Sequence, residues 1–475
     1  MMRRRRTGAR RLRGLGALLV GTLVMTGCSS TDDWASPDPA RPVVDLSFEV
    51  GHDLRSVTGR ERIDFTPDLR VCELVFRAWP NKPATARTGN ALEVTAAWVD
   101  GERVVPVVLA AGAPEGQPGT LVELPLPACV AAGRTVSAEL AFTLTLGEGT
   151  DERVGVSAGG DVAWFATAFP LLAWERGRGW AREPAVAVVG EMTTSETFDL
   201  RSLAVTAPSE HAVMGTGAST GSRRDEASGM TVHGFADPAV RDVAVTVGRL
   251  EVVQREVDGV RVHVGAPPGA TRESPARWAA EVARAIRDTA GYLGAFPYTD
   301  LWVSVLPDQT SGIEHSGAMH FGDLRFDESG WLVTHEVAHM WFYGLVGNNQ
   351  GAHPWLDESF ATFVQVIADQ RGSDVRRAPV PPELEGQVGQ PVSHWERYRR
   401  PSAAYVTGVY TAGAAALVDA RRRAGAQEFD DALRAYLAAN AHEIAEPADV
   451  EDAFAHLPMV LESLRDAGAL PPAIP

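Results

Sequence analysis

Alternating apolar and polar positions dominate the first half of the chain and give way to helical spacing in the second half. From Val43 to about Val253, short runs such as "VVDLSFEV" and "TVSAELAFTLTL" place an apolar residue at every second position, as half-buried strands do. Glycine, proline and aspartate separate these runs, and no helix-period segment of useful length interrupts them. The pattern predicts an all-β region built as a sandwich or saddle of antiparallel sheets.

The spacing of apolar residues changes near Gly265, and from there the sequence predicts a mixture of helices and strands. Ser274, followed by proline, is typical of a helix start, and apolar residues then recur four apart. The run "LWVSVLP", residues 301–307, predicts a buried strand. The sequence therefore indicates an α+β multidomain protein, with a β-rich domain over residues 43–255 and a mostly helical domain over residues 256–475. Later helices are expected over four segments: Trp331 to Leu345, Glu358 to Gln370, Ala403 to Arg423 and Gln427 to Ala439.

Residues 1–27 have the composition of an export signal. An arginine-rich stretch precedes an apolar run from Leu15 to Met25, which is far shorter than the ~20 residues that span a bilayer. The run ends in "MTGCSS", which resembles the bacterial lipoprotein signal in which the cysteine, here Cys28, is lipidated. The alternative is a plain secretory signal with a chance cysteine. Residues 28–42 are rich in Ser, Asp and Pro and suit a flexible tether. We therefore expect an exported protein, lipid-anchored at the outer face of the bacterial cell membrane.

Charge and cysteine content restrict the partners and the compartment. The net charge is −17 at pH 7 even with the basic N-terminus included, which argues against nucleic acid as a partner. Two further cysteines, Cys72 and Cys129, either pair in an oxidising compartment or remain buried thiols, and the sequence leaves both open. No pattern indicates an oligomeric state.

Two histidines in an apolar helical run carry the chemistry. "THEVAHMW" places His335 and His339 four apart, so on a helix both imidazoles lie on one face and reach one point. Glu336 lies near enough to act on a water molecule there. The spacing alone also fits a helix face with satisfied core histidines. Eighteen residues separate His339 from Glu358, which offers a third ligand, and catalytic zinc takes three protein ligands. The sequence therefore predicts one zinc ion per chain.

These motifs resemble the gluzincin aminopeptidases, the family of aminopeptidase N and the leukotriene hydrolase. The family's H-E-x-x-H and its glutamate in a W-L-x-E-x-F-A context are both present. "SGIEHSG" takes the place of the family's Gly-Ala-Met-Glu-Asn-x-Gly strand, which puts Glu314 where the family binds the substrate's amino group. His315 replaces the family's asparagine and is expected near the substrate backbone. "AYVTGVYTAGAAAL" matches the family's Tyr-x4-Tyr-x2-Gly helix start, with Tyr405 leading and Tyr410 in the catalytic place.

The resemblance implies an N-terminal β saddle followed by a thermolysin-like zinc-peptidase domain, and a zinc-dependent aminopeptidase that acts on peptides. Zinc would activate a water molecule and polarise the scissile carbonyl, while Glu336 takes the water's proton. Tyr410 would stabilise the oxyanion, and Glu314 would pair with the α-ammonium. Tyr405 is assigned either to the cleft wall or to packing. The chain ends 117 residues after Glu358, so we expect a more open cleft than in members that add a large helical domain.

Two other functions fit part of this pattern. A related zinc hydrolase, either an endopeptidase or an epoxide-opening enzyme, would share the metal site but would not need Glu314. A non-catalytic surface binding protein with a structural metal would not need a general base at Glu336. The aminopeptidase accounts for both residues and is the hypothesis that the sequence favours.

Overall fold

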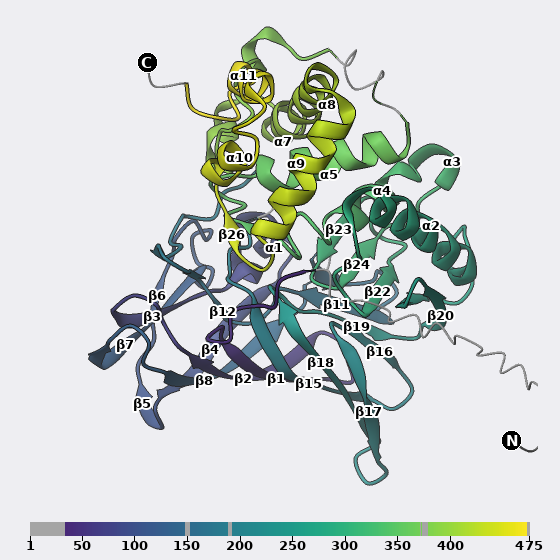
Figure 1. The fold of residues 1–475 in the computed structure, drawn as a ribbon. Coiled ribbons are helices and arrows are strands. Elements are labelled where there is room, and N and C mark those ends of the chain that lie inside the picture. The colour runs from purple at the N-terminus through teal and green to yellow at the C-terminus, as the bar shows by residue number, and fades with distance from the viewer. Residues whose placement is uncertain (1–33, 148–152, 189–191, 371, 373–378, 473–475) are drawn as a thin grey trace, which may run out of the picture.

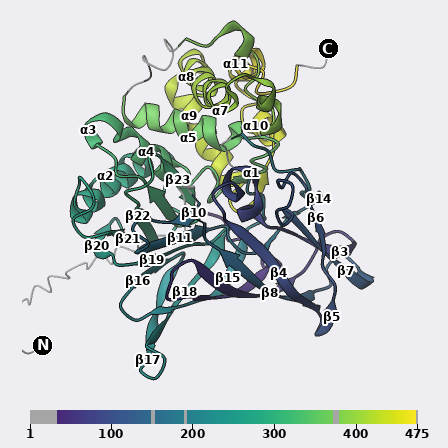
Figure 2. The same cartoon turned by 180° about the vertical axis from the view of Figure 1, so that it is seen from behind.

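A computed structural model describes residues 34–147, 153–188, 192–370, 372 and 379–472. A β-rich domain forms one side of the molecule, and the helices of a second domain cover the other side (Figures 1 and 2). The predicted export signal, Cys28 and most of the predicted tether lie outside the described residues. Within the described part, no helix combines the length and the apolar character needed to cross a bilayer.

An eight-stranded sheet forms the base of the β domain, in the order β17-β18-β15-β1-β2-β8-β4-β5. The inner face of this sheet follows from alternation. In β2, every second residue from Val57 to Phe65 is buried, and the residues between these are more exposed. The pairs are antiparallel except β1 with β15, which run parallel. The strands are β1 (Val43–Val50), β2 (Ser56–Phe65), β4 (Ala91–Val99), β5 (Glu102–Val104), β8 (Val136–Thr145), β15 (Phe198–Pro208), β17 (Ala218–Asp225) and β18 (Met230–Val240).

Two four-stranded sheets pack over this base. Their orders are β12-β3-β7-β6 and β10-β11-β19-β16, and a short hairpin of β13 and β14 accompanies them. The strands are β3 (Val71–Arg77), β6 (Val107–Leu109), β7 (Leu121–Val130), β10 (Val154–Val156), β11 (Val162–Ala166), β12 (Leu171–Leu172), β13 (Trp174–Glu175), β14 (Gly179–Trp180), β16 (Ala212–Gly215) and β19 (Ala244–Gly248).

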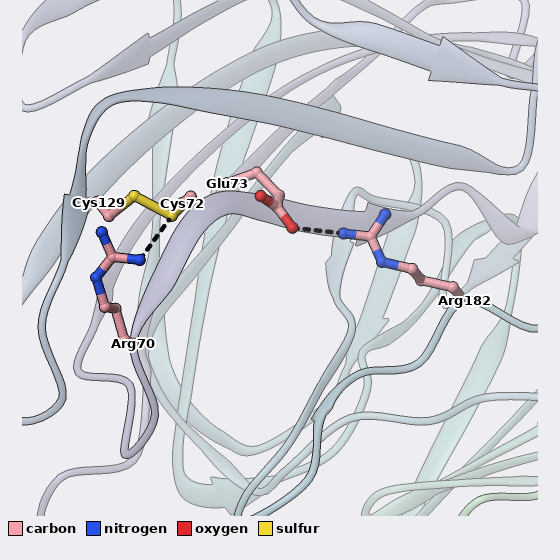
Figure 3. Close-up of a disulfide and its surroundings, with 5 residues drawn as sticks. All are labelled: Arg70, Cys72, Glu73, Cys129 and Arg182. Atoms are coloured by element: carbon pink, nitrogen blue, oxygen red, sulfur yellow. Dashed lines mark hydrogen bonds and ion pairs between the residues drawn. A yellow bond between two sulfur atoms is a disulfide. The ribbon is translucent and has the colours of Figure 1, made fainter.

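A disulfide joins two neighbouring strands of the β domain. Cys72 in β3 and Cys129 in β7 are bonded across the antiparallel pair (Figure 3). Arg182 donates to Glu73 beside it, at 2.7 Å, and adds a link between distant parts of the domain. Of the two states that the sequence left open for these cysteines, the structure shows the paired one.

The second domain starts with a five-stranded sheet, in the order β20-β21-β22-β24-β23. The predicted strand at residues 301–307 is present as β22, and the predicted helix start is present at α2, where Arg277 N–H donates to the Ser274 hydroxyl. The predicted domain boundary at residue 255 lies inside β20, so the chain changes sheet slightly earlier. The elements are β20 (Glu251–Val257), β21 (Val260–Ala266), α2 (Pro275–Leu293), β22 (Asp300–Val305), β23 (Gly312–His315) and β24 (Ala318–Phe321).

Helices complete the second domain and lie above the β domain in both views (Figures 1 and 2). A two-stranded parallel pair, β25 with β26, ties the loop after the histidine helix to a segment near the C-terminus. The elements are α3 (Phe326–Ser329), α4 (Trp331–Ala338), β25 (Gly347–Asn348), α5 (Trp355–Ala368), α7 (Pro401–Tyr405), a π-helix η4 (Val406–Thr411), α8 (Ala412–Ala424), α9 (Ala426–Ala439), β26 (Ile444–Ala445), α10 (Pro447–Ala453) and α11 (Pro458–Asp466).

Two helix predictions need correction. The helix expected to run to Leu345 ends at Ala338. The amides that follow first form tighter turns, such as Met340 N–H to the carbonyl of Val337, and then wider ones, such as Gly344 N–H to the carbonyl of His339. The single helix expected over residues 403–423 is broken by the π-helix at Val406–Thr411. Both irregularities lie next to the residues that the sequence marked as chemical.

One buried arginine fastens the two domains together. Arg241, in the turn between β18 and β19, donates to the carbonyls of Gly344, Leu345 and Glu443 in the second domain. It also donates to the carbonyl of Ser195 in the first domain. A side chain from the β domain therefore donates to backbone carbonyls in the loop after α4 and in the segment before β26.

Candidate active site

Three side chains from two helices converge on one point. His335 and His339 lie one turn apart at the end of α4, and their Nε2 atoms are 3.2 Å apart. Glu358, in the first turn of α5, places Oε2 at 3.4 Å from each of these nitrogens. Zinc bound to nitrogen at about 2.0–2.1 Å in a tetrahedron keeps its ligand atoms roughly 3.3 Å apart. The spacing of the triad therefore fits one zinc ion.

Two further observations support this fit. His339 Nδ1 lies 3.0 Å from the carbonyl of Phe342 and donates to it, which leaves Nε2 with a lone pair for a metal. Glu358 Oε2 is buried, and the described residues give it no hydrogen-bond donor. An orphaned carboxylate oxygen facing two imidazoles is the arrangement expected of a ligand set.

The electrostatics of the triad also favour a cation. Burial disfavours charge at His339, but the carboxylates of Glu314 and Glu358 outweigh it and raise the pKa of this imidazole well above its usual value. Burial would likewise raise the pKa of Glu358, yet the two imidazoles lower it to about 2. The site therefore holds positive charge strongly, and a metal would displace the proton from His339.

Glu336 stands beside the triad and close to strand β23. A Cβ atom added to Gly312 would lie 2.7 Å from Glu336 Oε1, so only glycine lets the strand pass this close to the carboxylate. Glu336, Glu314 and His339 each offer an atom within 4.8 Å of the others. The predicted general base and the predicted amine-binding carboxylate therefore share one site.

Tyr410 reaches the triad from the π-helix η4. Its hydroxyl donates to Glu358 Oε1 at 2.5 Å, and its ring stacks on His335 with centroids 5.8 Å apart. Burial and the charge of Glu358 raise the pKa of Tyr410 well above its usual value, so the hydroxyl keeps its proton. The Ser359 hydroxyl donates to the carbonyl of Val409, which stabilises the irregular turn.

Glu314 is buried in β23 and is held by two residues that the sequence analysis did not identify. Gln350 Nε2 donates to Glu314 Oε1 at 3.2 Å, and Arg153 Nη2 lies 3.9 Å from the same oxygen. Arg153 comes from the β domain, so both domains contribute to this site. Neither residue belongs to a recognisable motif, and each is far from Glu314 along the chain.

His315 and Tyr405 lie behind the site instead of in it. His315 is fully buried, with Nδ1 at 3.1 Å from Asp242 Oδ2, and Asp242 also accepts from the Ser316 amide. Tyr405 is fully buried and packs edge-on against the ring of Tyr410, with centroids 5.6 Å apart. Neither side chain lines the cavity at the triad.

A cavity of about 400 Å³ opens onto the triad, Glu314, Glu336 and Tyr410. Trp331, Leu332 and Val406 form an apolar part of its wall, and Trp331 and Val406 are partly open to solvent. All the charged side chains of the lining belong to the triad and the two neighbouring glutamates. The cavity can take a peptide with its reacting bond beside the metal ligands.

Residues 327–465 match the domain described as "Peptidase family M1 domain". "Aminopeptidase M1-A" from Oryza sativa subsp. japonica is 32% identical over 142 residues, which cover 26% of this chain and 16% of that protein. "Membrane alanyl aminopeptidase" from Manduca sexta is 30% identical over 135 residues, covering 24% of this chain and 13% of that protein. This chain thus matches less than a fifth of the length of these relatives.

Solved structures extend the likeness to almost the whole chain. The M1 zinc metallopeptidase from Deinococcus radiodurans superposes with a TM-score of 0.65 at 19% identity, over 92% of this chain and 95% of that chain. A point mutant of that enzyme with a bound Tyr-Ser-Ala substrate gives a TM-score of 0.64 at 19% identity, over 92% of this chain and 96% of that chain. The matched segment contains His335, His339, Glu358 and Tyr410, and the chain as a whole has a fold similar to that of these two-domain M1 zinc metallopeptidases.

Proposed function

We propose that this protein is a zinc-dependent aminopeptidase that removes residues from the N-terminus of peptides. The observation that carries the proposal is the buried carboxylate of Glu314 in the same cavity as the metal ligands. A metal triad with a general base fits any hydrolase of this type. A further buried carboxylate at the cavity fits a substrate that brings its own positive charge.

The metal triad is formed by His335, His339 and Glu358, and zinc held there supplies Lewis acidity to a water molecule and to the scissile carbonyl. Glu336 takes the proton of the attacking water and passes it to the leaving amine. Tyr410, whose hydroxyl keeps its proton, donates a hydrogen bond to the carbonyl oxygen as negative charge develops there.

Glu314 determines where the peptide is cut. An α-ammonium paired with this carboxylate places the first peptide bond of the substrate beside Glu336. A peptide that continues past Glu314 would bury its carboxylate without a cation from the substrate, which costs free energy. These two effects favour cleavage at the end of a chain over cleavage inside it.

The test compares one peptide with a free and with an acetylated N-terminus. Acetylation removes the positive charge, and a hydrogen bond to a charged group contributes on the order of 1.5–3 kcal/mol, so kcat/KM should fall roughly ten- to hundredfold. Glu314→Gln keeps the shape of the side chain and removes its charge, so this variant should lose most of the discrimination. Equal kcat/KM values of the wild type on both forms would favour an endopeptidase instead.

We further propose attachment to the outer face of the bacterial cell membrane through a lipid on Cys28. The support is the short apolar run before "MTGCSS" and the tether-like composition that follows. Mass spectrometry of the membrane-extracted protein is the direct test. A mature chain that begins elsewhere, or Cys28→Ala protein that stays on the membrane, would contradict this attachment.

A further inference from the structure

We infer that Gln350 is a positioning residue for amine recognition, and that it acts by fixing one oxygen of Glu314. This inference rests on the proposed aminopeptidase function and names a residue that sets its specificity. Gln350 follows β25 in the loop between the two metal-ligand helices, and its side chain is fully buried.

The amide of Gln350 connects two buried carboxylates. Its Nε2 donates to Glu314 Oε1 at 3.2 Å and to Asp357 Oδ2 at 2.8 Å. Only the nitrogen end of an amide can donate, so the two acceptors together determine the orientation of the side chain. Asp357 in turn accepts from the backbone amide of Glu358 at 2.8 Å. A continuous set of hydrogen bonds therefore runs from the amine-binding carboxylate to the first turn of α5.

Gln350 is the hydrogen-bond donor that holds Glu314 in place. Among the described residues, no other side chain donates to this carboxylate within hydrogen-bond distance, and Arg153 Nη2 lies 3.9 Å away. A buried carboxylate with one side-chain donor depends strongly on that donor. Loss of the amide would leave Glu314 free to turn toward Arg153.

The contacts also leave one side of the carboxylate available. Gln350 and Arg153 both approach Oε1 of Glu314, and no hydrogen bond from a described side chain reaches Oε2. Glu314 itself lines the cavity. Because Oε1 is held in place, Oε2 has one fixed orientation in which an incoming α-ammonium can donate to it. Gln350 therefore acts on the binding of a charged N-terminus and not on the bond-breaking step.

The neighbouring residue provides a matched control. Asn349 is also buried in this loop, and its Nδ2 also donates to two carboxylates, Glu175 at 2.7 Å and Glu183 at 3.1 Å. These acids lie outside the cavity at the triad. Gln350→Met and Asn349→Leu each remove an amide and keep a similar volume, so they disturb the same loop but only one of them affects Glu314.

The experiment measures kcat, KM and zinc content for the wild type and both variants, on one peptide in free and N-acetylated forms. For Gln350→Met, KM for the free peptide should rise about tenfold or more, the range for a hydrogen bond to a charged group. Its kcat, its zinc content and its activity on the acetylated peptide should stay close to the wild-type values. Asn349→Leu should retain the wild-type KM for the free peptide.

Three results would overturn the inference. They are an unchanged KM in Gln350→Met, an equal loss on both peptide forms, and a loss of zinc, since the last two indicate general damage to the site. If Gln350→Met does not fold, Gln350→Leu, again with Asn349→Leu as its control, also removes the donor, and the same difference between the free and the acetylated peptide is expected. A wild type that treats both peptide forms equally would reject the proposed function as well. A discriminating wild type with an unaffected Gln350 variant rejects only the role of Gln350.

Discussion

At the scale of single residues, the candidate site separates three side chains that can hold a metal from those proposed to act on water and substrate. His335, His339 and Glu358 direct their atoms to one point, at separations of 3.2–3.4 Å. Glu336 lies to one side, next to the backbone of Gly312. A second combination, Glu314 with Glu336 and His339, also brings potential ligand atoms within 4.8 Å of one another. Metal content can distinguish the two sets.

Glu336→Gln should keep its zinc and lose activity by roughly 10²–10⁴-fold, the range for a lost general base. Glu358→Ala should lose zinc, because it removes the oxygen that faces both imidazoles. Zinc per chain is measured by atomic absorption after gel filtration, together with kcat. Zinc lost from Glu336→Gln and retained by Glu358→Ala would assign the metal to the second combination.

Residues of the site were predictable where their relation is local in sequence. The spacing of His335 and His339 places both on one face of a single helix, and the structure shows this arrangement. Gln350 and Arg153 could not be found in this way, because they reach Glu314 from a loop and from the other domain. His315 was expected near the substrate from its place in a motif, but the side chain turns toward Asp242.

At the scale of elements, strand β23 and helix α4 approach so closely that one methyl group would matter. A Cβ atom on Gly312 would lie 2.7 Å from Glu336 Oε1 and 2.8 Å from Phe321 Cε1. Gly312→Ala should therefore displace the flexible end of Glu336, while the helix that holds the histidines stays in place.

Gly312→Ala should lower kcat by up to about 100-fold, since a displacement of about 1 Å can have this effect on a catalytic group. Zinc content should change little, while the melting temperature should fall because the buried ring of Phe321 must also move. Gly291→Ala in α2 is the control, because a Cβ there meets nothing within 4 Å. Wild-type kcat in Gly312→Ala would show that Glu336 does not need its present position.

The element boundaries that sequence patterns missed have causes outside the elements themselves. The apolar run after His339 has helical composition. However, Arg241, which lies about a hundred residues earlier in the chain, donates hydrogen bonds to the carbonyls of Gly344 and Leu345 in this run. The π-helix is stabilised by Ser359 from another helix, whose hydroxyl donates to the carbonyl of Val409. The β domain and β22 were predictable because alternation and apolar runs are local signals.

At the scale of the whole molecule, the junction between the domains buries an acid that resists ionisation. Asp237, in β18, is almost fully buried, and its carboxylate accepts from the amide of Ala239. Burial, together with the charges of Asp300 and Asp199, raises the pKa of Asp237 to about 7. Asp300 belongs to β22, so this effect acts across the two domains.

Asp237→Asn should stabilise the protein at neutral and alkaline pH. The folded carboxyl, with its pKa of about 7, binds a proton more tightly than the unfolded one at 3.8, so wild-type stability falls as pH rises between these values. Asparagine keeps the acceptor for Ala239 and cannot ionise. The gain in melting temperature should thus be small near pH 4 and should grow to a plateau above about pH 8. A gain independent of pH would show that Asp237 ionises normally.

Arg241 also has a consequence for dividing this protein into parts. The segment with recognisable sequence, residues 327–465, contains the carbonyls of Gly344, Leu345 and Glu443 but not the guanidinium that binds them. An excised fragment would lose this side-chain donor from all three carbonyls, and would keep only the backbone amides of His442 and Gly347, which donate to Leu345 and Glu443. A transplantable unit that keeps these contacts is therefore larger than residues 327–465, because it has to include the turn between β18 and β19 that supplies Arg241.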